Sequence, residues 1–160
     1  MRYPSTRLAA AVQHLARNYK ARLGIDIHLD HQKLQAVLFF MHAKGLCKDG
    51  KSVFEDRPVV GEHGPIFRAI FDQLHSRGEA SIVDVFIDTP KANKRGRTPF
   101  RIPALSDANV WSLLEAVFED YGHLTTQQLM NLTQAPDGPW ARARLQKLDV
   151  ISDMVIVSCY

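Results

Sequence analysis

The sequence has little cysteine and no long hydrophobic run. Cys47 and Cys159 are its two cysteines and lie in unrelated contexts, so a disulfide-scaffold protein is excluded and a reduced protein is expected. The unbroken apolar run 37–41 is far shorter than the roughly 20 residues that a membrane-spanning helix needs. The basic N-terminus with Arg2 and Arg7 is not followed by a signal-peptide core. We therefore expect a cytoplasmic protein that contacts no membrane.

Patterns typical of catalytic and metal sites are also missing. His28 and His31 have a helical spacing, but no third ligand follows at a recognisable distance and there is no Cys-x-x-Cys pair. No serine lies in a Gly-x-Ser-x-Gly motif, which forms the nucleophile elbow of many hydrolases. The turn 61–64 has too few glycines to hold a phosphate. We expect no cofactor, no metal and no enzymatic activity, with Cys47 a half-buried structural residue. An enzyme with an unfamiliar site around His63 or Cys47 stays open as an alternative.

Length, composition and charge are those of one globular domain. The 160 residues are 46% hydrophobic and 23% charged, which predicts a single domain over 1–160. The net charge is +3, and the excess is concentrated at 89–101, which contains five Lys or Arg residues and no acidic residue. We expect this segment to be an exposed and mobile basic loop, and to be a place where an anionic surface docks.

Periodicity predicts a mostly helical α+β domain of about six helices, with a small antiparallel β-sheet in the middle of the chain. Apolar residues recur at helical spacing, and the sheet is expected from the β-branched segment 81–87 and a short strand at 100–102. The expected helices are 5–23, 30–46, 65–76, 106–121, a short helix ending at 133, a short helix beginning at 139, and 152–160.

Local signals set several helix ends. Ser5 is expected to cap the first helix and Gly24 to end it, while Thr125 and Gln128 form a capping box. In the turn before the third helix, Gly64 is expected to take a positive φ and Pro65 to occupy the first helical position.

The segment 125–147 supports a second reading. A capped short helix, a Pro/Gly turn and a helix that carries Arg142, Arg144 and Lys147 resemble a helix-turn-helix. A DNA-binding transcriptional regulator therefore remains an alternative function, and nucleic acid an alternative partner.

Five short motifs follow one another along the chain. They are Lys33-Leu34-Gln35 followed by Val37-Leu38-Phe39-Phe40 and His42; Phe54 with Gly64-Pro65-Ile66; Tyr121-Gly122 with Leu124-Thr125; Pro139-Trp140 with Ala143; and Ile151-Ser152-Asp153. In this order the motifs resemble those of the SocA-like antitoxin family, whose domain is also called Panacea. The resemblance runs from about Ala10 to the C-terminus, and the family usually has Trp where this chain has Gly61.

This resemblance implies the antitoxin half of a bacterial, mobile-element or phage-associated toxin–antitoxin pair. It implies neutralisation of a cognate protein toxin by direct binding, and delivery of the toxin to a cytosolic protease remains a variant. The expected partner-binding residues are Glu62, His63, Phe67, Arg68, Lys94, Arg95 and Arg97, with Phe67 an anchor only if it is exposed. The expected structural residues of the motifs are Lys33, Leu34, Gln35, Gly64, Pro65, Tyr121, Pro139 and Trp140, and Trp140 is expected to be buried beside the helix 106–121.

Overall fold

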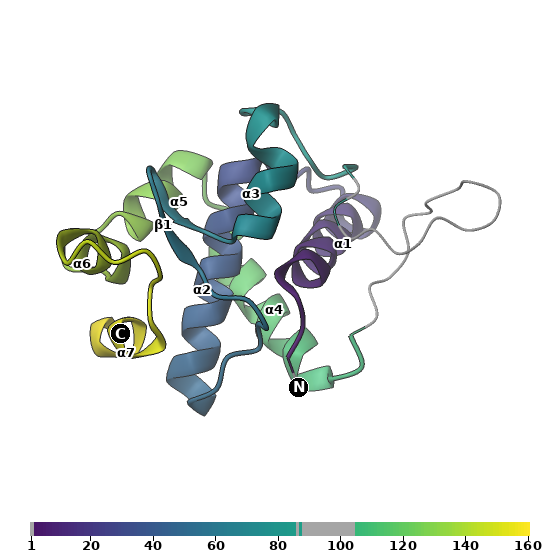
Figure 1. Cartoon of the computed structure of the whole chain (residues 1–160). Helices are drawn as coiled ribbons and strands as arrows, with labels where there is room; N and C mark the ends of the chain where they lie inside the picture. The colour runs from purple at the N-terminus through teal and green to yellow at the C-terminus, as the bar shows by residue number, and fades with distance from the viewer. Residues whose placement is uncertain (1, 86, 88–104) are drawn as a thin grey trace, which may run out of the picture.

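The computed structural model describes residues 2–85, 87 and 105–160, and within them the mostly helical α+β class is confirmed (Figure 1). This part of the chain holds seven α-helices, against the six or so expected, one short 3-10 helix and one two-stranded antiparallel sheet. In chain order the elements are α1 (Ser5–Leu23), α2 (His31–Asp49), β1 (Val59–Gly61), β2 (Gly64–Ile66), α3 (Arg68–Leu74), η1 (His75–Arg77), α4 (Ala108–Tyr121), α5 (Thr126–Thr133), α6 (Pro139–Leu145) and α7 (Asp153–Cys159).

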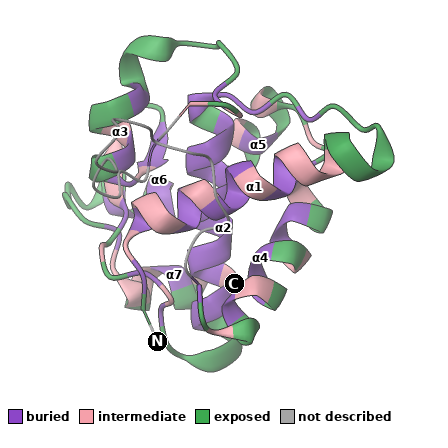
Figure 2. Ribbon diagram, turned by 90° about the vertical axis from the view of Figure 1, so that its right-hand side faces the viewer, coloured by how far each residue is buried: buried purple, intermediate pink, exposed green. Residues whose placement is uncertain are grey.

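Helix α2 is the centre of the fold. It contacts α1, α3, α4, α5, α7 and β2, and runs through the middle of the molecule with the other helices around it (Figure 1). Figure 2 shows its length as an almost continuous buried ribbon. Leu38, Phe39 and Met41 are fully buried, as expected for a helix that is apolar on nearly every side.

The ends of the first two helices depend on different kinds of contact. The Asp30 carboxylate accepts a hydrogen bond from the Lys33 amide at 2.8 Å and caps the start of α2. The helix continues beyond the predicted end at 46 and is closed by Gly50, which has φ +68°. The expected cap by Ser5 is wrong. Ser5 lies inside α1 after Pro4, and both its amide and its hydroxyl donate to the Asp56 carboxylate. The Ser5 hydroxyl therefore binds a carboxylate 51 positions away and does not cap the helix.

A tight hairpin replaces the predicted start of the third helix. Strands β1 and β2 pair antiparallel with Gly61 opposite Gly64, and Glu62 and His63 form the turn. Gly64 has φ +140°, which confirms the predicted positive φ. Pro65 does not begin a helix, because it lies in β2, and α3 starts only after Phe67.

The predicted strand at 81–87 does not form in the residues that the structure describes there. The Gln13 side-chain amide donates to the carbonyl oxygens of Ile82, at 2.6 Å, and Val85, and the Arg17 guanidinium donates to that of Val83 at 2.6 Å. Side chains of α1 thus satisfy backbone groups that a neighbouring strand would otherwise bind. The expected basic loop at 89–101 and the expected strand at 100–102 lie outside the described residues.

The C-terminal helices begin where local signals predicted. Thr125 and Gln128 form the expected capping box of α5, Pro139 is the first residue of α6, and the Ser152 hydroxyl caps α7. The chain between α6 and α7 pairs with β1: the Val60 amide donates to the Asp149 carbonyl at 2.8 Å. In the described residues no helix is both long and apolar enough to span a bilayer.

Candidate functional site

A groove opens beside the hairpin, between the start of α2, α3 and α5. Its volume is about 460 Å³. The walls include His31 and Gln35 of α2, the hairpin turn, Arg68 and Phe71 of α3, and Met130 and Thr133 of α5. The structure brings together three of the predicted partner-binding residues here, since Glu62, His63 and Arg68 all line the groove and are exposed.

Phe67 is not part of this surface. Its side chain is 0% exposed and stacks on Phe54, with 4.6 Å between the ring centroids. The condition under which it would be an anchor therefore fails, and Phe67 belongs to the core. Its backbone is held by Gln35, which accepts from the Phe67 amide at 2.8 Å and donates to the Phe67 carbonyl at 3.3 Å.

Two side chains fix the hairpin from outside it, in addition to Gln35, which holds the residue that follows it. The Gln134 amide donates to the His63 carbonyl at 2.7 Å, and the Trp140 indole N–H donates to the Gly61 carbonyl at 2.9 Å. Trp140 is buried, as predicted, and its indole N–H is bonded to the last residue of β1, while its packing beside the helix 106–121 stays a prediction. The exposed turn is thus presented from a rigid base.

Lys33 joins α2 to the end of α4. Its buried ammonium donates to the carbonyl oxygens of Gly122 and Leu124, both at 2.7 Å. Burial lowers the pKa of Lys33, while Asp30 opposes that shift. A cation at a helix C-terminus compensates the unpaired carbonyl groups there. Nearby, Tyr121 stacks on Phe40 with 4.4 Å between the centroids, and Leu34 is fully buried.

The groove offers polar groups of both signs. The Arg68 guanidinium lies 5.8 Å from the centre of the Phe71 ring, and the His75 ring stacks on Phe71 with 4.8 Å between the ring centroids. Burial lowers the pKa of His31, so this imidazole is neutral near pH 7. Exposed Glu62 adds a carboxylate. Such a set can bind a polypeptide surface through hydrogen bonds and ion pairs.

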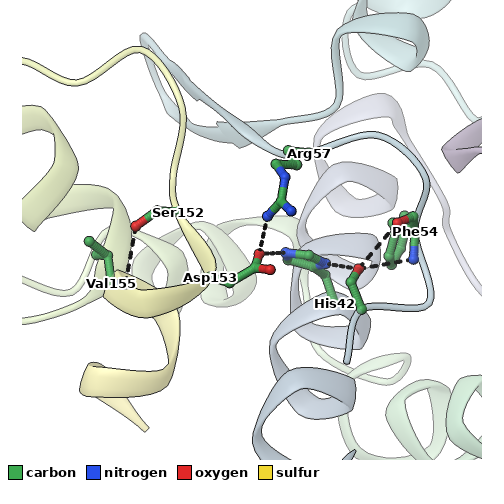
Figure 3. Close-up of polar contacts among 7 residues, drawn as sticks. His42, Phe54, Arg57, Ser152, Asp153 and Val155 are labelled. Atoms are coloured by element: carbon green, nitrogen blue, oxygen red, sulfur yellow. Dashed lines mark hydrogen bonds and ion pairs between the residues drawn. The ribbon is translucent and has the colours of Figure 1, made fainter. Parts of the chain in front are cut away.

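A second polar cluster joins α2 to α7, and the sequence motifs did not identify it as a unit (Figure 3). Ser52 Oγ lies 2.8 Å from His42 Nδ1, and His42 Nε2 points toward Asp153 Oδ1 at 3.6 Å, beyond hydrogen-bond distance. Arg57 forms an ion pair with the same carboxylate oxygen at 2.6 Å. Burial lowers the pKa of His42 to about 4, against the raising effect of Asp153.

This cluster combines the residue types of a Ser-His-Asp site but cannot act as one. His42 and Ser52 are both buried, so a substrate has no access to the hydroxyl. Ser52 Oγ also accepts a hydrogen bond from the Phe54 amide at 3.0 Å, which fixes the chain after α2. The cluster holds the C-terminal helix against the core.

Metal-ligating and thiol groups do not add a further site among the described residues. There, no group of three or more His, Cys, Asp or Glu side chains is placed to hold a metal ion. Cys47 and Cys159 are both free, and Cys47 is exposed, not half-buried as expected. The exposure arises because α2 continues for nearly a turn past 46 and carries Cys47 on its solvent side.

Comparison with known proteins supplies the family. A family model described as antitoxin SocA-like, Panacea domain, matches residues 34–141. No curated protein and no solved structure matches the chain. The matched residues run from α2 to the first three residues of α6 and include the hairpin, all of α3 and all of α5.

Proposed function

The chain belongs to the SocA-like antitoxin family with a Panacea domain, and we propose that it neutralises a cognate protein toxin by binding it directly. The family match over 34–141 carries this proposal. The groove supports it, because a fixed hairpin exposes polar side chains of both signs beside a hollow that the matched residues form. The role is that of a binding protein and not of an enzyme.

We place the toxin contact on the groove surface, with Glu62, His63 and Arg68 at its rim. A stable complex usually buries about 1,200–2,000 Å² in total, which is more than this rim provides. Lys94, Arg95 and Arg97 lie outside the described residues, and we propose that they add an electrostatic attraction to an acidic face of the toxin.

Two mechanisms follow from binding. The antitoxin either covers the active surface of the toxin or delivers the bound toxin to a cytosolic protease. The two differ in stoichiometry and turnover. Occlusion requires at least one antitoxin per toxin and leaves the toxin level unchanged, whereas delivery lowers the toxin level and is lost when the protease is inactivated.

The test uses the product of the neighbouring gene as the toxin. Expression of that product alone should stop growth, co-expression of the full-length chain should restore it, and the two proteins should co-purify. Arg68→Glu should weaken binding and rescue, while Arg77→Glu, a matched reversal at an exposed arginine outside the groove, should not. If the product of the neighbouring gene does not stop growth, the proposed toxin is contradicted. If the two variants bind it equally well, the proposed surface is contradicted.

The DNA-binding alternative remains a prediction with its own test. Segment 125–147 does contain two helices, but α6 has 7 residues and Lys147 lies beyond its end. Arg144 is positioned over the Trp140 ring, 5.0 Å from its centre. Specific duplex binding at physiological salt, with a strong salt dependence, would support a regulator in place of an antitoxin.

A further inference from the structure

Helices α6 and α7 carry large apolar side chains that the fold does not cover. Leu145 is 85% exposed and Met154 is 83% exposed, and Leu148 and Val157 are also exposed. A single exposed apolar side chain needs no explanation, whereas several from adjacent elements indicate an interaction surface. We call these four residues the C-terminal apolar face.

Three of the four residues lie on two helices that pack on each other, and Leu148 lies in the turn between them. Arg142 of α6 contacts the Ser158 hydroxyl of α7 at 3.4 Å. Figure 1 shows α6 and α7 next to each other at the C-terminal end of the molecule, on the side away from α1.

The turn that connects the two helices is held in a strained conformation. Lys147 has φ +57°, a left-handed conformation that residues other than glycine rarely adopt. The Leu148 amide donates to the Ala143 carbonyl at 2.9 Å, and the Lys147 amide donates to the Arg144 carbonyl at 3.1 Å, as in a Schellman motif. Glycine is the usual residue at this position, so a lysine here costs stability.

The charge around the face selects its occupant. Between positions 142 and 149 the chain carries Arg142, Arg144 and Lys147, all exposed, against the single acid Asp149. On α7 the carboxylate of Asp153, next to Met154, is already paired with Arg57 at 2.6 Å. In a symmetric dimer the same cations would face each other across the twofold axis, which disfavours a second copy of this chain. A partner with apolar side chains bordered by Asp or Glu is complementary to the face.

We propose that the C-terminal apolar face is a second docking surface for the toxin, which seats there a segment with apolar side chains bordered by carboxylates. This inference rests on the proposed function. All four residues of the face lie at or beyond 145, outside the span 34–141 that the family model matches. The face therefore contributes selectivity for this chain's own toxin, in addition to what the shared groove provides.

The experiment measures the affinity of the full-length chain for the neighbouring-gene toxin. The double variant Leu145→Ser/Met154→Ser should weaken binding about tenfold or more, the size of effect expected for a central apolar contact. The matched control Leu23→Ser/Ile25→Ser replaces two apolar side chains that are also exposed, at the end of α1 and just after it, and should change binding less than about twofold. Circular dichroism of each variant verifies folding.

A charge variant tests the selectivity of the face independently. Lys147→Glu should slow association at low salt, and the difference from wild type should shrink as salt rises. Wild-type affinity in both face variants would overturn the docking surface while leaving the proposed function intact, and failure of the wild-type chain to bind the toxin would overturn both. A dimer of the free chain that Leu145→Ser/Met154→Ser dissociates would assign the face to self-association and overturn the proposal.

Discussion

The indole N–H of Trp140 and the carbonyl oxygen of Gly61 are joined by a 2.9 Å hydrogen bond across 79 positions of the sequence. A Cβ atom added at Gly61 would lie 2.5 Å from the Gly64 carbonyl oxygen, so the hairpin is packed too closely there to carry a side chain. The aromatic support of the hairpin comes from Trp140 of α6.

Shortening Trp140 should separate α6 from the hairpin. Trp140→Ala should reduce the free energy of unfolding by about 3–5 kcal/mol because a large buried ring is lost. Trp140→Phe keeps most of the ring and loses the hydrogen bond, so the cost should be nearer 1 kcal/mol. Urea denaturation measures both. In a Trp111→Phe background, Trp140 emission should be blue-shifted and poorly quenched, and a red-shifted, quenchable band would contradict its burial.

Gly64 should not tolerate a side chain. At φ +140°, Gly64→Val is strained and should cost about 1–3 kcal/mol. The added Cβ would also lie 3.3 Å from Thr133 Oγ1. Gly24→Val is the control, because Gly24 has a positive φ of 67° but no atom within 4 Å of the added Cβ. The difference between the two melting temperatures reports the α5 contact together with the greater backbone strain of a side chain at φ +140°. A wild-type value for Gly64→Val would contradict the assigned hairpin.

Lys33 should contribute to stability through its two carbonyl partners. Lys33→Met retains the aliphatic length but leaves the Gly122 and Leu124 oxygens without this donor. We expect a loss of about 2–3 kcal/mol in thermal or chemical unfolding. Lys44→Met removes a solvent-exposed ion pair with Asp120 and should change stability by less than about 1 kcal/mol. Equal effects of the two changes would show that the buried ammonium is not a structural group.

Acid should destabilise the fold through His42. Because burial lowers the pKa of His42 in the folded chain to about 4 from its ordinary value of 6.5, the unfolded chain binds the proton more readily between these values. The stabilising contribution is therefore complete above pH 6.5 and is lost as pH falls toward 4, by up to about 3 kcal/mol. Burial also lowers the pKa of His14 and of His31, which adds a loss of the same sign.

The measurement is the free energy of unfolding at a series of pH values from 4 to 7. His42→Gln lowers stability at every pH, so the informative quantity is the slope. This variant should show a clearly shallower slope than the wild type between pH 6.5 and 4. Identical slopes would mean that His42 does not carry the pH dependence.

Features set by neighbouring residues were predictable from the sequence. The capping box at Thr125, the start of α6 at Pro139 and the positive φ of Gly64 each depend on a few adjacent positions. Pro65 and the segment 81–85 were predicted wrongly because distant side chains determine them: Gln35 holds the backbone after the hairpin, and Gln13 satisfies the carbonyl groups that a strand would pair.

The same limit applies to the site. Glu62, His63 and Arg68 lie in and just after the turn that Gly61, Gly64 and Pro65 indicate in the sequence. Their proximity was therefore predictable, and all three line the groove. Helical periodicity could not decide whether Phe67 faces solvent or the core. Phe67 lies just before α3 and not within it, so its orientation is not set by the apolar face of that helix. The cluster of His42 with Asp153, and the face on α6 and α7, carry no local motif and depend on the packing of the C-terminal helices.

The pairing of β1 with the chain around Val150 has a consequence for synthesis. Val59 forms an antiparallel bridge with Val150, and the Ile151 amide donates to the Pro58 carbonyl at 3.0 Å. The second edge of the hairpin therefore stays open until the chain around position 151 has left the ribosome, long after α2 and the hairpin itself. A product that stops before that point leaves an unpaired strand edge, which invites aggregation and proteolysis. Complete translation is thus a condition for a protected protein.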